Sequence, residues 1–343
     1  MEKLFFASDY MEGAHEKILD RLYELNQVKS TGYGWDDFSE RARQKIRAAC
    51  AAPEADIFFL AGGTQSNAVV IDSILRPYQG VIAADTGHIT THEAGAIEYG
   101  GHKVLSVLHT NGKITAADVT ACMEAYLSDD NHDHIVMPGM VYISQPTEYG
   151  TLYSLAELTA LSEVCRKHSL PLYLDGARLA YALACAENDV TLPDIAKLCD
   201  AFYIGGTKCG TLFGEAVVFP EKNFVPHFFT MMKQHGALLA KGFVTGLQFD
   251  TLFTEELYFK IGRNAIDTAE TIRESLREKG YRFAFETPTN QIFIVLDKEK
   301  LAYLNERVVM GFWEKKDNAH TVMRIATSWA TTAEDVQKLI ALL

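Results

Sequence analysis

Apolar residues occur along this chain in short runs, and segments with helical spacing lie between them. Ile57–Ala61 is one such run; it ends at Gly62 and Gly63, and the segment 64–75 then reads as a helix that Pro77 stops. Similar runs of strand length occupy 81–84, 140–144, 172–174 and 201–204. Strands that alternate with helices predict a mostly parallel sheet covered by helices on both faces.

One pair of runs predicts an exception to the parallel arrangement. Ile204 and Ala216 end and begin two apolar runs, and about eleven residues separate them. A parallel pair needs a helical crossover, for which this connection is too short. The strands 201–204 and 216–219 should therefore run antiparallel, which makes the predicted sheet mixed.

Helix-start signals and a change of pattern suggest two domains. Ser154 and Glu157 form a capping box ahead of an apolar helical stripe. After about residue 245 a long helical segment, 254–279, closes on Gly280. Strand-like runs and a last helix that begins at Thr331 follow; the runs are 281–285, 291–296 and 322–327. We predict a large α/β domain over 1–245 and a smaller α+β domain over 246–343.

Charge and cysteine content narrow the class of protein. The formal net charge of the 343 residues is −13, which argues against general binding to nucleic acid phosphates. The N-terminal segment does not resemble a signal peptide, and no apolar run has the length of a membrane span. The six cysteines are scattered, so we expect reduced core thiols and a cytoplasmic enzyme that binds neither nucleic acid nor membrane.

Residues able to do chemistry cluster after the predicted strands. In an open α/β sheet, ligands bind beyond the carboxyl ends of the strands. The residues that fall there are Gly63, Thr64, Gln65, His88, the segment 145–148, Asp175, Arg178, Thr207 and Lys208. Their convergence on one edge predicts a ligand site.

Two of these groups have alternative interpretations. Gly63 and Thr64 open a helix, where backbone N–H groups suit a phosphate, although a tight strand-to-helix turn has the same signature. No dinucleotide or P-loop glycine pattern is present. Asp175 directly follows an apolar strand, where an unpaired carboxylate is costly. Either Arg178 is its partner or Asp175 faces a cationic ring nitrogen.

Lys208 lies in "YIGGTKCGTLFGEAVVF" between two apolar runs. It is either an exposed loop lysine or a lysine committed to chemistry, with Gly205, Gly206 and Gly210 leaving space for a planar ring. A carboxylate, an imine-forming lysine and a phosphate cup at neighbouring strand ends are what pyridoxal phosphate requires. We therefore predict pyridoxal 5'-phosphate as the cofactor.

The order and spacing of "AGGTQSN", "HITTHEAG", "LDGARL" and "IGGTKCG" resemble the low-specificity L-threonine aldolase family. The resemblance extends from "FASDY" at 6–10 to "MRIATSW" at 323–329. It implies pyridoxal phosphate fold type I, which is aspartate aminotransferase-like, and an active site at a dimer interface in a homodimer or homotetramer.

The resemblance also implies roles for individual residues. Lys208 would bind the cofactor covalently, Asp175 would pair with its ring nitrogen, and His88 would stack on the ring; a satisfied core histidine is the alternative for His88. The other residues that the resemblance places around the cofactor are Gly63, Thr64, Gln65, Arg178, Thr207 and Lys241.

The resemblance assigns a second set of residues to the substrate. Ser8, Arg178 and Arg324 would bind the amino acid carboxylate, although a surface salt bridge is the alternative for Arg324. Tyr33 and Lys241 would reach the site of a neighbouring subunit. Many relatives have "ENTHN" where this chain has "SQPTE", so Thr147 stands where a histidine contacts the substrate hydroxyl. This departure leaves the base for that hydroxyl open.

The reaction implied is carbon–carbon lyase chemistry. L-Threonine or L-allo-threonine would undergo retro-aldol cleavage to glycine and an aldehyde. A β-eliminating lyase or aminotransferase of the same fold is the alternative, and a cofactor-free binding protein is a third interpretation. No metal is expected, because "HDH" at 132–134 lies in an acidic segment typical of a solvated loop.

Overall fold

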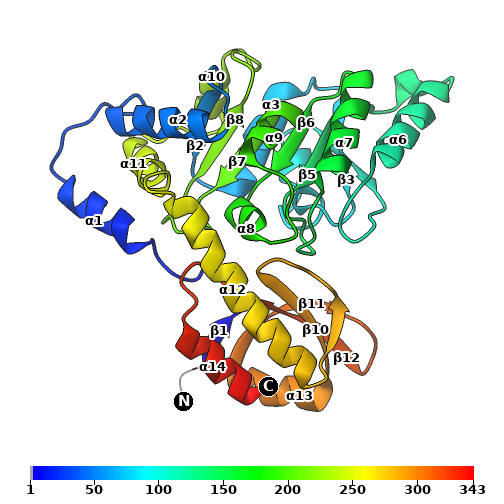
Figure 1. Ribbon diagram of the computed structural model, residues 1–343. Coiled ribbons are helices and arrows are strands. Elements are labelled where there is room, and N and C mark those ends of the chain that lie inside the picture. The colour runs from blue at the N-terminus through cyan, green and yellow to red at the C-terminus, as the bar shows by residue number, and fades with distance from the viewer. Residues whose placement is uncertain (1–2) are drawn as a thin grey trace.

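The computed structural model describes residues 3–343, which form two sheets with helices around them (Figure 1). The seven-stranded sheet has the order β2-β8-β7-β6-β5-β3-β4. Its strands are β2 (Asp56–Leu60), β3 (Gln79–Ala84), β4 (Lys103–Val107), β5 (Met137–Ser144), β6 (Leu172–Asp175), β7 (Ala201–Gly205) and β8 (Glu215–Phe219). The predicted strands are all present, and β4 had not been predicted.

The sheet is mixed in the way the spacing predicted. β3, β4, β5, β6 and β7 pair in parallel, whereas β8 is antiparallel to both of its neighbours, β7 and β2. Because β8 runs the other way, its first residue lies at the carboxyl edge of the other strands. Glu215 is accordingly in register with Gly205 on one side and Leu60 on the other.

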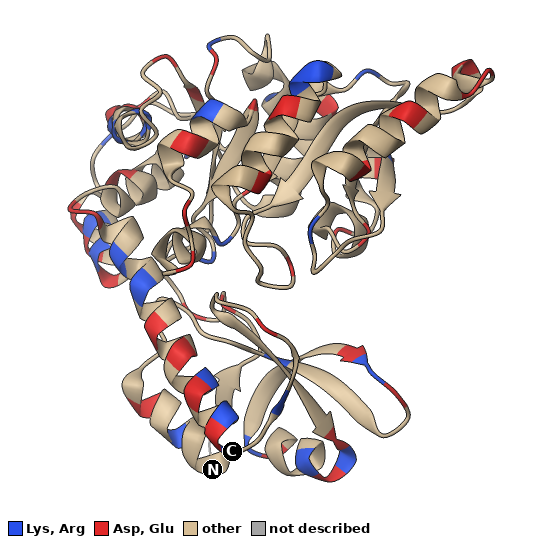
Figure 2. Ribbon diagram, turned by 45° about the vertical axis from the view of Figure 1, so that its right-hand side comes forward, with Lys and Arg blue, Asp and Glu red and all other residues tan. Residues whose placement is uncertain are grey.

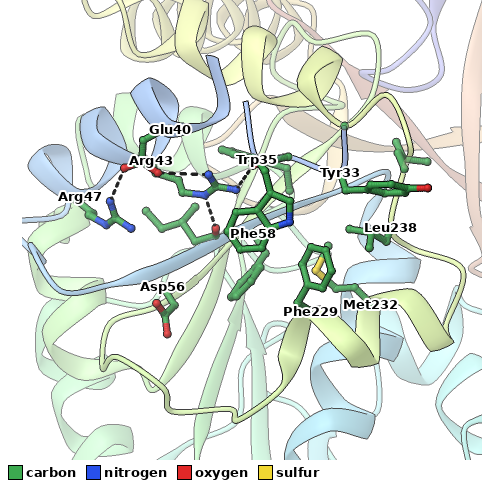
Figure 3. Close-up of a pocket in the computed structure, with 15 residues that line it drawn as sticks. Tyr33, Trp35, Glu40, Arg43, Arg47, Asp56, Phe58, Phe229, Met232 and Leu238 are labelled. Carbon is green, nitrogen blue, oxygen red and sulfur yellow. Dashed lines mark hydrogen bonds and ion pairs between the residues drawn. The ribbon is translucent and has the colours of Figure 1, made fainter. Parts of the chain in front are cut away.

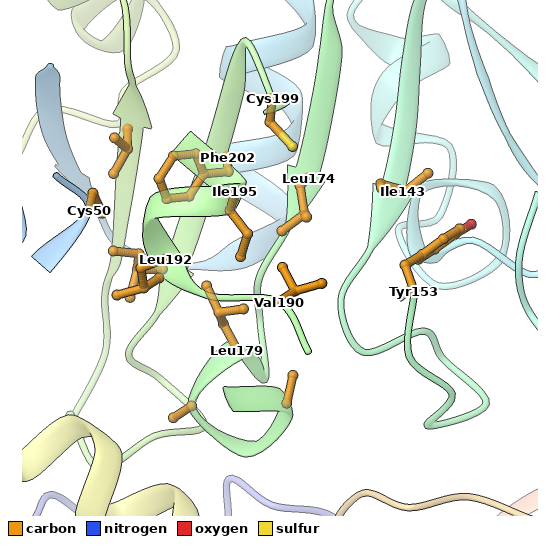
Figure 4. Close-up of a cluster of buried hydrophobic side chains, with 14 of the residues drawn as sticks. Cys50, Ile143, Tyr153, Leu174, Leu179, Val190, Leu192, Ile195, Cys199 and Phe202 are labelled. Carbon is orange, nitrogen blue, oxygen red and sulfur yellow. The ribbon is translucent and has the colours of Figure 1, made fainter. Parts of the chain in front are cut away.

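Alternate residues of each strand pack into two different apolar layers. Tyr142 and Tyr173 belong to the layer beneath α3 (Gly63–Ile74) and α10 (Phe228–Gln234). Leu172 and Leu174 belong to the opposite layer, beneath α7 (Leu155–Lys167), α8 (Leu179–Ala184) and α9 (Leu192–Leu198) (Figure 4). Burial on both faces explains the near-continuous apolar runs.

The second sheet has the order β1-β11-β12-β10-β9. Its strands are β1 (Leu4–Phe6), β9 (Arg282–Phe285), β10 (Gln291–Asp297), β11 (Val308–Lys315) and β12 (His320–Ala326). The division at residue 245 stays a prediction, but the N-terminal strand β1 pairs in parallel with β11 and so lies in the sheet of the C-terminal part. A three-residue strand carries too little pattern to show its distant partner.

The long helix α12 (Leu257–Glu278) runs from the large sheet unit alongside the smaller sheet (Figure 1). It begins three residues later than predicted, since Glu255 and Glu256 have positive φ angles. The last helix, α14 (Ala333–Leu342), is capped by Thr332 with Asp335 rather than by Thr331 with Glu334. The remaining helices are α1 (Glu16–Glu24), α2 (Asp37–Ala49), α4 (His88–Thr91), α5 (Ala96–Tyr99), α6 (Ala116–Ser128), α11 (Phe243–Leu252), α13 (Lys298–Asn305) and the 3₁₀ turn His132–His134.

Charged residues of both signs are interspersed along the outer helices, most visibly along α12 (Figure 2).

All six cysteines are unpaired, and five of them are buried. Over residues 3–343, no helix is long and apolar enough to cross a membrane.

Candidate active site

Two adjoining compartments open at the carboxyl edge of the large sheet. The inner one has a volume of about 300 Å³, and the outer one, of about 460 Å³, extends to β11 and β12 of the smaller sheet. Both are lined by Tyr10, His88, Glu148, Arg178 and Lys208. The predicted convergence of strand ends is therefore present, and the smaller sheet supplies one wall.

Asp175 ends β6 on the floor of the inner compartment. Its carboxylate accepts hydrogen bonds from the Tyr142 hydroxyl at 2.7 Å, from Asn67 Nδ2 at 3.1 Å and from the Tyr203 hydroxyl. Burial alone would raise the pKa of Asp175, but the charge on His88 and these hydrogen bonds bring the pKa below its usual value. The carboxylate is thus held as an anion by the charge on His88 and by neutral donors, and Arg178 is not its partner.

Lys208 lies in the loop between β7 and β8, with its ammonium group facing both compartments. Its backbone carbonyl accepts a hydrogen bond from the Tyr181 hydroxyl, which fixes the loop. Among the residues that the structure describes, Nζ has no hydrogen-bond or ion-pair partner, and its nearest ring contact is Tyr10 at 5.9 Å. Burial and the neighbouring Arg178 lower the pKa of Lys208, which favours the neutral, nucleophilic amine.

The glycines around Lys208 have a different purpose from the one predicted. A Cβ at Gly205 would lie 2.4 Å from the Ala177 carbonyl oxygen, and one at Gly206 would lie 2.6 Å from that of Gly214. Gly210 has a φ of +93°, which favours glycine. These glycines permit close backbone packing and a turn, so the prediction that they make room for a cofactor ring is wrong.

The N-terminus of α3 forms one end of the inner compartment. Gly63 and Thr64 line it, and the N-cap residue Gly62 makes no side-chain capping bond. The first N–H groups of a helix have no partner within the helix, so they are free for an anion. Thr207, also predicted as a cofactor residue, lines the same compartment.

His88 begins α4 and is held by two carboxylates. Its Nδ1 lies 2.7 Å from Glu93 Oε1, and its backbone N–H donates to Glu148 Oε1 at 2.9 Å. Glu93 Oε1 also accepts from Asn67 Nδ2 at 2.7 Å, so Asn67 links Glu93, the partner of His88, to Asp175. The ring of His88 is oriented but not enclosed, which leaves it free to pack on a ligand.

Two arginines line the compartments, and they differ in their partners: Arg178 is paired with a carboxylate, whereas Arg324 bonds to neutral groups. Arg178 makes two bonds to Asp9, from Nε to Oδ2 at 2.5 Å and from Nη2 to Oδ1 at 3.0 Å. Burial would raise the pKa of Asp9, but Arg178 and Lys208 lower it to about 2. Arg324 donates to Gln291 and to the Ala7 carbonyl, whereas its Nε is buried without a partner. Nη1 and Nη2 each keep a second N–H, and Arg324 lines the outer compartment, so it retains donor capacity toward a ligand.

Five of the predicted residues line neither compartment: Gln65, Ser8, Thr147, Tyr33 and Lys241. The Gln65 Oε1 atom accepts from the Ala61 N–H at 3.2 Å, so this side chain closes the turn before α3. Ser8 is buried and lines neither compartment. The Thr147 hydroxyl bonds to that of Thr151 at 2.7 Å inside a turn, so the structure does not bring Thr147 to the substrate position that the family resemblance implies.

Tyr33 and Lys241 lie together on another surface. The Tyr33 N–H donates to the Ala240 carbonyl at 3.2 Å, and the Tyr33 side chain is 42% exposed at a small cavity of about 160 Å³ (Figure 3). Lys241 is exposed on the adjoining turn. Neither residue reaches the compartments of its own chain, as expected for residues directed to a neighbour; that assignment stays a prediction.

Sequence reasoning missed several residues that build the site. They are Asp9, Tyr10, Asn67, His92, Glu93, Tyr142, Tyr203, Glu215, Gln291 and Trp313. A strand-face argument could have found Tyr142 and Tyr203, which share the layer of Tyr173. Glu215 could have been placed from the predicted antiparallel strand; burial raises its pKa to about 7. The others depend on contacts between distant segments.

The side chains present fit pyridoxal phosphate. An amine without a hydrogen-bond partner faces the inner compartment, a carboxylate kept anionic lies on its floor, and the open N-terminus of a 12-residue helix forms one end. These groups match the aldehyde, ring nitrogen and phosphate of the cofactor.

Over residues 3–343, no group of three or more histidine, cysteine or acidic side chains is placed to hold a metal ion.

Comparison with known proteins supports the same class. The beta-eliminating lyase family model matches residues 6–299. The structure of a threonine aldolase from Leishmania major shares 40% identity and a TM-score of 0.96, over 99% of this chain and 98% of that one. A low-specificity L-threonine aldolase of a Pseudomonas species is 28% identical over 98% of this chain and 96% of its own. The structure of aspartate aminotransferase from Thermus thermophilus is 14% identical, with a TM-score of 0.73 over 99% of this chain and 91% of that one. It shows the shared fold.

Fold and site together define a pyridoxal phosphate-dependent protein with the aspartate aminotransferase-like fold. Within that class, the chain belongs to the beta-eliminating lyase family, in its threonine aldolase group.

Proposed function

We propose that this protein is a carbon–carbon lyase that cleaves L-threonine and L-allo-threonine to glycine and acetaldehyde. The observation that carries the proposal is the Lys208 amine, which has no hydrogen-bond partner among residues 3–343 and shares the inner compartment with the anionic Asp175, next to an outer compartment lined by Arg324. The similarity to threonine aldolases favours this reaction over other chemistry on the same fold.

When bound, pyridoxal phosphate supplies an electron sink for the pair released as the Cα–Cβ bond breaks. Lys208 would hold its aldehyde, Asp175 would keep its ring nitrogen protonated, and Gly63 with Thr64 would hold its phosphate at the start of α3. His88, oriented by Glu93, would pack on the ring. Asn67 bonds to both Asp175 and Glu93, so it keeps these groups in one fixed arrangement.

The substrate would lie in the outer compartment, with its carboxylate at Arg324. Orientation decides which bond at Cα breaks, because the bond that stands perpendicular to the ring reacts. Arg324 on β12 and Lys208 beyond β7 come from different sheets, so the cleft between the sheets fixes that orientation. Arg178 is paired with Asp9 and would support the carboxylate site through its remaining donors.

Arg324→Ala should raise the KM for L-threonine about 10- to 100-fold, since a charge-assisted hydrogen bond contributes on the order of 1.5–3 kcal/mol. Steady-state kinetics on both enzymes measures the effect. Arg324→Lys should recover only part of it, because an ammonium cannot bind a carboxylate with two parallel bonds. Arg282→Ala, at an exposed position on β9, is the matched control. An unchanged KM in Arg324→Ala would place the carboxylate elsewhere.

The proposed activity is tested by coupling acetaldehyde formation to alcohol dehydrogenase. Both threonine diastereomers should be cleaved, with pyruvate, ammonia and amino-group transfer measured in parallel. Release of pyruvate and ammonia without acetaldehyde would favour a β-eliminating lyase, and amino transfer would favour an aminotransferase.

The proposed cleavage of both diastereomers does not rest on Thr147. The family resemblance assigns the β-hydroxyl to this residue, but its side chain is closed into a turn with Thr151. Thr147→His would therefore disturb the turn before it altered selectivity. The groups that do face the outer compartment, His88, His92 and Glu148, are the ones able to meet the hydroxyl.

We also propose a cytoplasmic homodimer or homotetramer. Support for shared sites comes from Tyr33 and Lys241, which are exposed away from their own compartments. Six unpaired cysteines suit a reducing compartment. Light scattering would give the assembly, and loss of activity in Tyr33→Ala without loss of the fold would support a shared site.

A further inference from the structure

His92 is the histidine of the outer compartment whose ring is not held by the protein. It follows the last residue of α4 and is exposed toward the cavity that it lines. Within residues 3–343, neither of its ring nitrogens has a hydrogen-bond partner, in contrast to His88, which is bonded to Glu93. Both nitrogens of His92 are thus available to a ligand.

Two aromatic rings lie near His92. Its centroid lies 5.7 Å from that of His88 and 6.3 Å from that of Trp313 on β11. His88 borders the inner compartment as well, whereas Trp313 borders only the outer one. His92 therefore lies near both the histidine placed to pack on the cofactor ring and a residue of the outer wall, in the compartment proposed for the substrate.

The other candidate bases are already engaged. His88 uses Nδ1 for Glu93, and its ring is the one placed to pack on the cofactor. Glu148 accepts hydrogen bonds from the Ser144 hydroxyl at 2.7 Å and from the His88 N–H at 2.9 Å. Among the histidine and acidic side chains that line this compartment, His92 is the one whose side chain has no hydrogen-bond partner within residues 3–343.

The charges around His92 favour its neutral form. Burial, then His88 on α4, then Arg324 on β12, lower its pKa below the usual value, and Lys208 and Arg178 act in the same direction. The remaining titratable groups that line this compartment are Tyr10, Glu148 and Tyr149. A neutral imidazole at neutral pH can accept a proton, as a general base must.

We propose that His92 is the catalytic base that takes the proton of the substrate β-hydroxyl, an inference that rests on the proposed aldolase function. The O–H proton moves to a ring nitrogen of His92. The oxygen electrons form the aldehyde carbonyl as the Cα–Cβ bond breaks, and the electron pair of that bond stays with Cα. Water then supplies a proton to Cα, giving glycine, and the imidazolium returns the hydroxyl proton to water, so that no net proton is gained or lost.

The central experiment compares His92→Phe with wild type in two reactions. Cleavage of L-threonine should fall in kcat/KM by about 10²-fold or more, the scale of a lost general base. Exchange of the glycine α-proton in deuterated water involves no β-hydroxyl and should continue at close to the wild-type rate. His134→Phe, the same substitution at an exposed histidine outside the site, should leave both reactions unchanged.

The pH profile gives a second readout. If the base must be neutral, kcat/KM of the wild type falls as the pH drops through the pKa of His92, which burial and the neighbouring positive charges hold below the usual histidine value. His92→Phe should lack this acid limb. If His92→Phe retained the acid limb, the limb would belong to another group, and the proposal would fail. If Glu148→Gln lost the limb instead, Glu148 would be the base.

A binding measurement without turnover completes the test. In protein labelled at histidine, the NMR signal absent from His92→Phe identifies His92. That signal should shift on addition of 3-hydroxybutyrate and stay in place with butyrate, which lacks the hydroxyl. Equal response to both acids, or near-wild-type cleavage by His92→Phe, overturns the proposal. Absence of cleavage by the wild type would instead overturn the aldolase function itself, and the role of His92 with it.

Discussion

Lys208→Ala should lower turnover by on the order of 10³-fold or more. Enzymes lose activity on this scale when their nucleophilic side chain is removed. The near-visible absorbance of the bound cofactor should disappear with it, because no other amine faces the inner compartment from the residues that line it. The fold should remain intact, since the ammonium group makes no hydrogen bond or ion pair that the rest of the described chain depends on. Activity, absorbance and thermal unfolding measure the three outcomes.

Lys197→Ala is the matched control for this variant, since Lys197 is exposed on α9. It should show wild-type absorbance and turnover. Borohydride treatment should fix the cofactor on the wild-type chain and on the control, and a mass spectrum of the peptides should place it on Lys208. Turnover by Lys208→Ala at the wild-type rate would remove the proposed mechanism.

Asp175→Asn should still bind the cofactor yet lose activity by roughly 10²- to 10⁴-fold, the range for removal of one preorganised electrostatic or proton-holding group. A neutral amide cannot hold a proton on the ring nitrogen. Its NH₂ group would also meet donors, the hydroxyls of Tyr142 and Tyr203 among them, which costs about 1–3 kcal/mol of stability for each polar group left unpaired. Cofactor titration, kcat and the free energy of unfolding separate these effects.

The pH dependence follows from the lowered pKa of Asp175. A carboxyl with a depressed pKa in the folded state stays ionised as the pH falls through its ordinary range, near 3.9, and loses its stabilising effect only below that. Between about pH 5 and 8, roughly where proteins are most stable, the ionisation of Asp175 should not change, so it should cause no change in activity with pH. Asp200→Asn is the control, at the opposite end of the strands, where Asp200 accepts from the Leu172 N–H. Equal losses in both variants would point to destabilisation rather than chemistry.

The sequence by itself determined the large sheet and the position of its chemistry. Strands buried on both faces need continuous apolar runs, so β5, β6 and β7 could be located from the order of residues alone. The antiparallel β8 followed from a connection too short for a crossover. Because parallel strands end at a common edge, the positions of Asp175 and Lys208 along the chain were enough to assign them to one site.

The tertiary structure alone decided the partners of those residues. Arg178 could have paired with Asp175, its neighbour in sequence, but it pairs with Asp9 from the segment after β1. Asp175 is instead held by Tyr142, Tyr203 and Asn67. Hydrogen bonds between side chains far apart in sequence leave no periodic signal along the chain, because their partners are set by how separate elements pack. For the same reason no pattern in the sequence distinguishes His92, whose free ring faces a compartment that β11 and β12 close from the other sheet.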